Sequence, residues 1–111
     1  MKNTNNVLND LYEVIQMRKS EKIEGSYTCY LFEKGLDKIL KKCGEECTEM
    51  IVAAKNNNSN EIIAECADLI YHIEVMLAAS NIPIDDVLIE LEKRAEKQRN
   101  LKQMKTVNKD S

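Results

Sequence analysis

Two helical patterns and the short turn between them occupy residues 30–80, which read YLFEKGLDKILKKCGEECTEMIVAAKNNNSNEIIAECADLIYHIEVMLAAS. In the first pattern, from about Tyr30 to Lys55, apolar residues recur at the three- and four-residue spacing of an amphipathic helix. Its apolar stripe consists of Leu36, Ile39, Leu40, Cys43, Cys47, Met50, Ile51 and Ala54. The polar run at residues 56–60 predicts a turn, and Asn58 followed three residues later by Glu61 resembles a capping box that opens a second helix.

This second helix, predicted to end near Ser80, is apolar on nearly every side, which is typical of a helix buried against more than one neighbour. Before the pair, apolar residues at helical spacing predict a helix from about Thr4 to Ser20, and Glu21 to Thr28 reads as a flexible polar loop. After the pair, Pro83 suits the start of a further helix, whose first turn is acidic. The sequence therefore predicts an all-α bundle of four main helices.

The composition supports one helical domain. The chain has 111 residues with one Pro, three Gly and no Trp, so few residues break helices and few favour strands. We expect residues 1–100 to form the domain and residues 101–111 to be a frayed tail. A chain of this size buries a modest share of its surface, and the nearly all-apolar helix needs a further neighbour. We therefore expect homodimerisation to complete the bundle.

Charge and hydropathy exclude several classes of protein. The net charge is −3, which leaves no broad basic surface for nucleic acid. No apolar run approaches the roughly 18 residues that cross a bilayer, and residues 1–6 lack the apolar centre of a signal peptide. We therefore expect a cytoplasmic protein that binds neither nucleic acid nor membranes.

Four cysteines stand at positions 29, 43, 47 and 66, and no two have the C-x-x-C spacing. Small, reduced and mostly buried side chains are the expected state of cysteines in a cytoplasmic protein. A soft-metal site formed by Cys43, Cys47 and Cys66 is one alternative, and disulfide bonds are another.

The spacing of the acidic residues is the feature of the sequence that indicates a chemical function. Glu45, Glu46 and Glu49 form the pattern Glu-Glu-x-x-Glu, and fifteen residues later Glu65 and Asp68 form Glu-x-x-Asp. Residues three apart are neighbours on a helix surface, so each pattern presents carboxylates side by side. If the two helices pack antiparallel, both sets can face one space, where they repel each other unless a cation neutralises them. Such oxygen ligands suit Mg²⁺ or Mn²⁺, and Mg²⁺ often shares its ligands between carboxylates and substrate phosphates.

Several of these acids differ from an ordinary solvated helix face. Glu46 falls at the edge of the apolar stripe, while Glu65, Asp68 and His72 share a narrow strip of an otherwise apolar helix. Acidic residues are seldom buried without a partner, so these positions indicate a functional site. Glu45 has an equally good interpretation as a solvated charge paired with a neighbouring lysine.

Further candidates surround the acids. Three lysines one to two turns earlier could receive phosphates as point charges or form a solvated basic patch; these are Lys38, Lys41 and Lys42. Tyr27 and Thr28, in the expected loop, could contact the ribose or the base of a nucleotide, or belong to a plain connector. His72, the only histidine, is a candidate for orienting Asp68 from one turn away. A structural histidine is the alternative.

Four stretches accompany the acidic pattern: Gly25-Ser26-Tyr27-Thr28, Lys38-Ile39-Leu40-Lys41-Lys42, Ala67-Asp68-Leu69-Ile70-Tyr71-His72 and Asp85-Asp86-Val87-Leu88. Together they resemble the phosphoribosyl-ATP pyrophosphatase family of the MazG-like all-α pyrophosphohydrolases, over about residues 7–94. The resemblance implies a homodimer that hydrolyses phosphoribosyl-ATP to phosphoribosyl-AMP and pyrophosphate, the second step of histidine biosynthesis. Some members carry a fused cyclohydrolase domain, whose motifs this sequence lacks.

The resemblance also implies a set of site residues. Matched to the family pattern, the ligands of Mg²⁺ are Glu46, Glu49, Glu65 and Asp68. Hydrolysis further requires a base or a group that orients water, and Glu46, Glu49 and Glu45 are the candidates for that role. Glu74 departs from the family, where we expect an apolar residue at its position.

Two other functions stay open at this point. A related enzyme acting on non-standard or deoxynucleoside triphosphates would share the acidic site without the run from Gly25 to Lys42. A non-enzymatic helical dimer or adaptor would explain the apolar helix but not the acids within it. Thermal stabilisation by Mg²⁺ plus nucleotide separates an enzyme from an adaptor, because a ligand that binds only the native state stabilises it.

Overall fold

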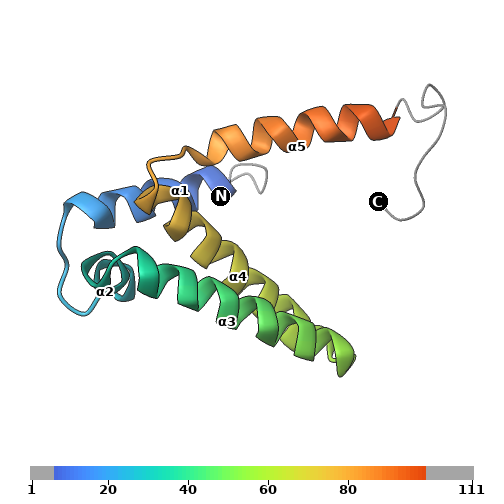
Figure 1. The fold of residues 1–111 in the computed structure, drawn as a ribbon, viewed down its shortest axis with the longest axis horizontal. Helices are drawn as coiled ribbons and strands as arrows, with labels where there is room; N and C mark the ends of the chain where they lie inside the picture. Colours follow the sequence, from blue (N-terminus) through green and yellow to red (C-terminus); the bar gives the residue numbers. More distant parts are fainter. Residues whose placement is uncertain (1–6, 100–111) are drawn as a thin grey trace.

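The computed structural model describes residues 7–99, and within that range the protein is all-α (Figure 1). The helices are α1 (Val7–Ser20), α2 (Tyr27–Lys34), α3 (Leu36–Lys55), α4 (Ser59–Ala79) and α5 (Ile84–Arg99). The all-α prediction is confirmed. Among these residues, no helix is both long and apolar enough to span a membrane. The predicted beginning of the first helix at residues 4–6 and the predicted tail at residues 101–111 lie outside the described residues.

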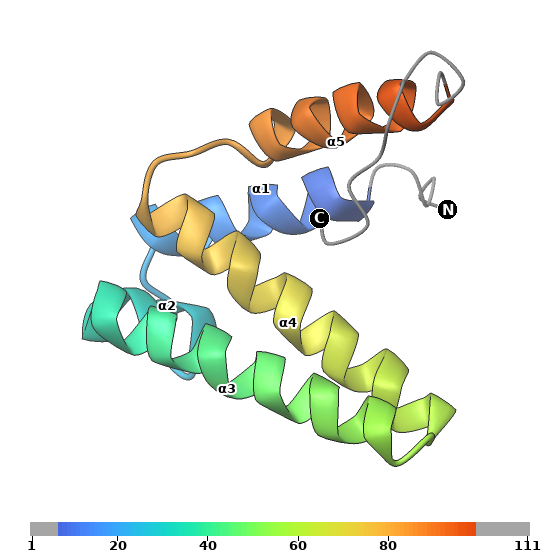
Figure 2. The same ribbon diagram turned by 45° about the vertical axis from the view of Figure 1, so that its right-hand side comes forward.

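Helices α3 and α4 form an antiparallel pair with the most extensive helix–helix contact in the molecule (Figures 1 and 2). Asn57, with φ of 58°, reverses the chain between them. The side-chain oxygen of Asn58 accepts a hydrogen bond from the Glu61 main-chain N–H at 3.1 Å, which satisfies one of the free donors at the start of α4. The predicted cap is therefore present, and it marks the start of α4.

The prediction of one helix from Tyr30 to Lys55 is wrong, because the chain forms two helices across this region. Gly35 has φ of 98°, a conformation that residues with a Cβ rarely adopt, and it separates α2 from α3. Upstream, the Ser26 hydroxyl accepts a hydrogen bond from the Cys29 N–H at 3.1 Å. Ser26 thus caps α2, so Tyr27 and Thr28 lie in a helical first turn and not in a loop.

The core lies where α1, α2, the start of α3 and the start of α5 meet the C-terminal half of α4. Its buried apolar side chains are Tyr12, Ile15, Leu31, Ile39, Val75, Leu77, Ala78 and Ile84. Helix α1 crosses the end of α4, and α5 lies beside α1 (Figure 2). The Lys19 ammonium donates to the Ala78 carbonyl at 2.7 Å and to Asn81 Oδ1 at 2.8 Å. These hydrogen bonds hold α1 over the C-terminal end of α4.

Much of the predicted apolar stripe is open to solvent in a single chain. Ile39 is buried, but Leu40 and Ile51 on α3 are 46% and 58% exposed. On α4, Ile63 and Ile70 are 68% and 43% exposed. The expectation that this helix is buried on several sides holds for its C-terminal half only, and one side of the α3–α4 pair stays apolar and uncovered within the chain.

Candidate active site

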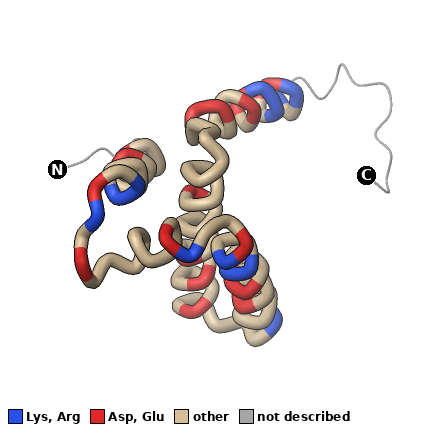
Figure 3. The backbone as a smooth tube through the Cα atoms, turned by 60° about the vertical axis from the view of Figure 1, so that its left-hand side comes forward, with Lys and Arg blue, Asp and Glu red and all other residues tan. Residues whose placement is uncertain are grey.

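Three of the predicted acids converge between α3 and α4. Each of Glu46, Glu49 and Glu65 places a carboxylate oxygen within 4.8 Å of the other two. Glu46 and Glu49 are about one turn apart on α3, and the antiparallel pairing brings the turn of α4 that carries Glu65 to the same level. Figure 3 shows acidic residues on both helices of the pair. We call these three residues the acid group.

The acid group is electrostatically unfavourable without a cation. Glu46 is only 6% exposed, and Glu65 Oε1 is buried with no hydrogen-bond partner among residues 7–99. Burial, together with the charges of Glu49, Glu46 and Asp68, raises the pKa of Glu65 above its usual value. An unpartnered buried oxygen is costly, and a divalent cation would supply both the missing contact and the missing charge. The all-oxygen donor set therefore fits Mg²⁺ or Mn²⁺.

Two predicted acids lie at the margin of the acid group. Asp68 is exposed one turn after Glu65 and acts on it through its charge, but its carboxylate is not among the oxygens that converge within 4.8 Å.

The second of these acids, Glu45, pairs with a lysine. The Lys42 ammonium lies 3.2 Å from a Glu45 oxygen and 3.6 Å from a Glu46 oxygen. The hydrogen bond from Lys42 lowers the pKa of Glu45 and raises that of Lys42. Glu45 is thus a lysine partner, in line with the alternative interpretation of this residue.

The three predicted phosphate-binding lysines form a basic border along α3. Lys42 is half-buried and bridges Glu45 and Glu46. Lys38 and Lys41 act on Glu45 through their charges. Lys41 is exposed and shares an open hollow with Glu49, which leaves its ammonium group accessible to an anion beside the acid group.

Helix α2 brings Tyr27 against α4. The Tyr27 hydroxyl lies 3.0 Å from His72 Nε2, and His72 Nδ1 lies 2.7 Å from the main-chain oxygen of Asp68. Next to them, the Thr28 and Tyr71 hydroxyls share a short hydrogen bond. The contact of His72 with Asp68 is therefore to the main chain and not to the carboxylate, which corrects the predicted mode of orientation.

One acidic residue near the site was assigned only a capping role from the sequence. A hollow beside the acid group is lined by Thr48, Glu49, Val52, Ala53, Asn56, Glu61 and Glu65. Glu61 stands four residues before Glu65, and residues four apart share one face of a helix. That spacing was available in the sequence and would have placed Glu61 at the edge of the site.

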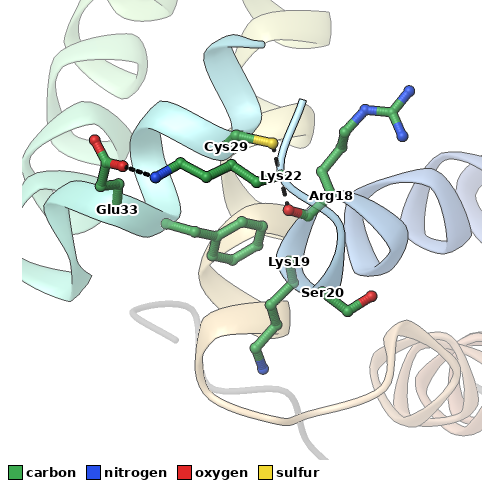
Figure 4. A pocket seen from close by; sticks show the side chains of 7 residues that line it. Arg18, Lys19, Ser20, Lys22, Cys29 and Glu33 are labelled. Atoms are coloured by element: carbon green, nitrogen blue, oxygen red, sulfur yellow. Dashed lines mark hydrogen bonds and ion pairs between the residues drawn. The ribbon is translucent and has the colours of Figure 1, made fainter. Parts of the chain in front are cut away.

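A second polar hollow lies between α1 and α2 and contains none of the predicted site residues (Figure 4). Its lining is Arg18, Lys19, Ser20, Lys22, Cys29, Phe32 and Glu33. The Lys22 ammonium pairs with Glu33 at 2.6 Å, and Lys19 is engaged with the end of α4. Lys22 and Lys19 therefore have partners within the chain, so the polar lining of this hollow is explained by contacts that join the helices.

The cysteines take no part in the acid group. All four are free thiols; Cys29 is buried and the other three are partly buried. Within the described part of the chain, the soft-metal grouping of Cys43, Cys47 and Cys66 is not formed, since the acid group is the only cluster of potential metal ligands found there.

Comparison with known proteins agrees with this geometry. The family model described as phosphoribosyl-ATP pyrophosphohydrolase matches residues 8–95. The chain belongs to the phosphoribosyl-ATP pyrophosphohydrolase family. The resemblance seen in the sequence is thereby confirmed, over nearly the same residues.

Relatives within this family match almost the whole chain. A protein named phosphoribosyl-ATP pyrophosphatase from Clostridium botulinum (strain Hall) is 55% identical over 108 residues, which are 96% of this chain and 98% of that protein. One of the same name from Listeria monocytogenes serovar 1/2a is 56% identical over 102 residues, 92% of this chain and 98% of that protein. A histidine biosynthesis bifunctional protein from Caldanaerobacter subterraneus is 56% identical over 91 residues, 82% of this chain and 44% of that protein.

Proposed function

We propose that this protein hydrolyses phosphoribosyl-ATP to phosphoribosyl-AMP and pyrophosphate in a Mg²⁺-dependent reaction, the second step of histidine biosynthesis. Family membership over residues 8–95 and relatives of that name at about 55% identity support the substrate and the reaction. The observation that supports the metal dependence is the acid group, in which a buried Glu65 oxygen has no hydrogen-bond partner among the described residues.

In this proposal the side chains of the acid group would hold the ion, with Asp68 beside them. When bound, Mg²⁺ neutralises charge on the triphosphate and favours attack at phosphorus. Water attacks one phosphorus of the α–β anhydride, and the bond from that phosphorus to the bridging oxygen breaks, which yields phosphoribosyl-AMP and pyrophosphate. A carboxylate of the acid group accepts the proton of the attacking water. Lys41 and Lys42 supply positive charge on the α3 side, where the departing phosphates carry negative charge.

Pyrophosphate release tests this proposal. With Mg²⁺, turnover of phosphoribosyl-ATP should greatly exceed turnover of ATP, dUTP and dCTP. Preference for a deoxynucleoside triphosphate would instead assign the acid group to a nucleotide-pool pyrophosphatase, and no release from any substrate would favour a non-enzymatic adaptor. Glu49→Gln should abolish turnover with the helical content unchanged, whereas the matched Glu90→Gln on the exposed face of α5 should retain it. Near-native turnover by Glu49→Gln would overturn the assignment of the acid group.

We further propose that two copies of the chain pair through the uncovered side of α3 and α4. Leu40, Ile51, Ile63 and Ile70 are all more than 40% exposed there, and a group of exposed large apolar side chains favours an interaction site. Light scattering should give the mass of a dimer. Ile63→Asp should shift it toward the monomer, while Ile89→Asp on α5, which is similarly exposed, should not. A monomer at every concentration would contradict the proposal.

A cytoplasmic location accompanies this function. The similarity to a protein named for histidine biosynthesis supports it.

A further inference from the structure

Two rows of apolar residues run outward from the core, one on α4 and one on α5. Residues seven apart lie on the same side of a helix, because seven residues make almost two full turns. On α4 the row consists of Leu77, Ile70 and Ile63, which are 6%, 43% and 68% exposed. Exposure therefore rises along the row, from the core toward the turn that joins α4 to α3.

The row on α5 shows the same change. Ile84 belongs to the core and is 7% exposed, Leu88 is partly buried against the core, and Leu91 is 56% exposed. Every residue from 89 to 99 is exposed, so the rest of α5 has no cover from the described part of the chain. Figures 1 and 2 show α4 and α5 diverging from the end of the molecule where α1 packs against both. The two uncovered rows are therefore extensions of one core.

The row on α4 lies away from the acid group. Ile63 and Glu65 are two residues apart, as are Asp68 and Ile70, and residues two apart point to nearly opposite sides of a helix. A molecule that covers the apolar row therefore leaves the carboxylates open to a substrate. A second copy of the chain carries the same two rows, and a two-fold axis lets each copy cover the other in the same way.

Charges beside the rows indicate which helices pair. Glu92 borders the row on α5 on one side, while on the other side Glu90 and Arg94 pair with each other at 3.1 Å. Lys55, one turn after Ile51, borders the uncovered side of the α3–α4 pair. Neither Glu92 nor Lys55 has an ion-pair partner among residues 7–99. Packing α5 on the α3–α4 pair of another copy brings these opposite charges together, whereas packing α5 on α5 would leave the row on α4 uncovered.

We propose that α5 of each copy packs across the uncovered side of the partner's α3–α4 pair. Leu91 then lies against the partner's Ile51 and the partner's Ile63, and Glu92 lies beside the partner's Lys55. This inference rests on the dimer proposed above and adds the helix that reaches from each copy over the other. Complementary charges at the border of the apolar contact fix its register.

Substitutions on opposite sides of α5 test this packing. In the full chain, Leu91→Asp should raise the dissociation constant of the dimer at least about tenfold in sedimentation experiments, because a carboxylate replaces an apolar contact in both copies. Ile89→Asp is the matched control, since Ile89 is 50% exposed and lies on the other side of α5; its dissociation constant should be unchanged. Circular dichroism should show the same helical content in both variants. An unchanged dissociation constant in Leu91→Asp would overturn the inference.

Charge reversal tests which helices meet. Glu92→Lys and Lys55→Glu should each raise the dissociation constant about threefold, the size of a surface ion pair. The chain that carries both substitutions should return to the value of the unaltered protein, because opposite charges then meet again. Glu13→Lys, on the exposed face of α1, should have no effect. Two weakened single variants without recovery in the double variant would overturn the pairing of α5 with the α3–α4 pair.

The outcomes separate this inference from the proposals above. A dimer weakened by Ile63→Asp but not by Leu91→Asp would keep the α3–α4 dimer and overturn the role of α5. A monomeric unaltered protein would overturn both. Turnover of phosphoribosyl-ATP is measured separately, so a failure of the proposed reaction would leave the result of the sedimentation experiments standing.

Discussion

Replacing Glu74 by glutamine is expected to change how the stability of the fold depends on pH. Glu74 lies on α4 with none of its surface exposed, and both carboxylate oxygens lack a hydrogen-bond partner within residues 7–99. Burial raises the pKa of Glu74 from 4.5 to about 7, because the charged form loses its hydration. The folded protein therefore holds this proton over a pH range in which the unfolded chain releases it.

The sign and size of the effect follow from that difference. Since the pKa is raised on folding, the contribution of Glu74 to stability is most favourable below pH 4.5 and is lost as the pH rises through about 7. At about 1.4 kcal/mol for each pH unit between the two values, the loss is about 3 kcal/mol at pH 8. This is a large part of the roughly 5–15 kcal/mol that stabilises a typical domain.

Urea unfolding of the unaltered protein and of Glu74→Gln, from about pH 5 to pH 8, measures this loss. Glutamine keeps the size and polarity of the side chain without its ionisation, so the pH-dependent part of the difference belongs to the carboxyl group. The free energy of unfolding of the unaltered protein should fall by about 2–3 kcal/mol relative to the variant over this range. Glu13→Gln, on the exposed face of α1, should show no such divergence. A difference that stays constant with pH would refute the reasoning.

Three further substitutions have expected outcomes. Gly44→Ala should raise the free energy of unfolding by about 1 kcal/mol in urea titrations, because a Cβ there meets no atom within 4 Å; a destabilised variant would reveal a neighbour outside the single chain. Gly35→Ala should lower it by about 1–2 kcal/mol, since the cost arises from φ of 98° and not from crowding; full stability would show that the break between α2 and α3 can relax. Glu65→Gln should raise the melting temperature in a chelator by relieving repulsion in the acid group, and should remove the gain on adding Mg²⁺. An undiminished Mg²⁺ gain would contradict the role of Glu65.

The convergence of the acids could be anticipated because it depends on regular geometry. The spacing of Glu46 and Glu49 fixes their relation on any α-helix, and a short polar turn, residues 56–58 in the structure, leaves little freedom in how the next helix returns. The position of Glu46 at the edge of the apolar stripe already indicated the burial that the structure shows.

Other features depend on single dihedral angles or on neighbours that periodicity does not report. The helical pattern runs through Gly35 without interruption, so the break there follows only from its φ. Ser26 is a strong capping residue, and taking it as one would have placed Tyr27 and Thr28 in a helix. Ile51 and Ile63 fit an apolar stripe, but the sequence pattern does not show whether another helix of the same chain or a second molecule covers these side chains.

The turn at Gly35, with its positive φ, separates two parts of the chain that carry different candidate site residues. Tyr27 lies on the short helix before it, while Glu46, Glu49 and Glu65 lie on the long pair after it. Because no continuous helix links the two parts, a substitution in α2 does not shift the register of the acids. In the proposed function the α3–α4 pair acts on the triphosphate, and Tyr27 on α2 is a predicted contact of the nucleoside. Changes of substrate within such a scaffold are therefore expected first in α2 and last in the carboxylates.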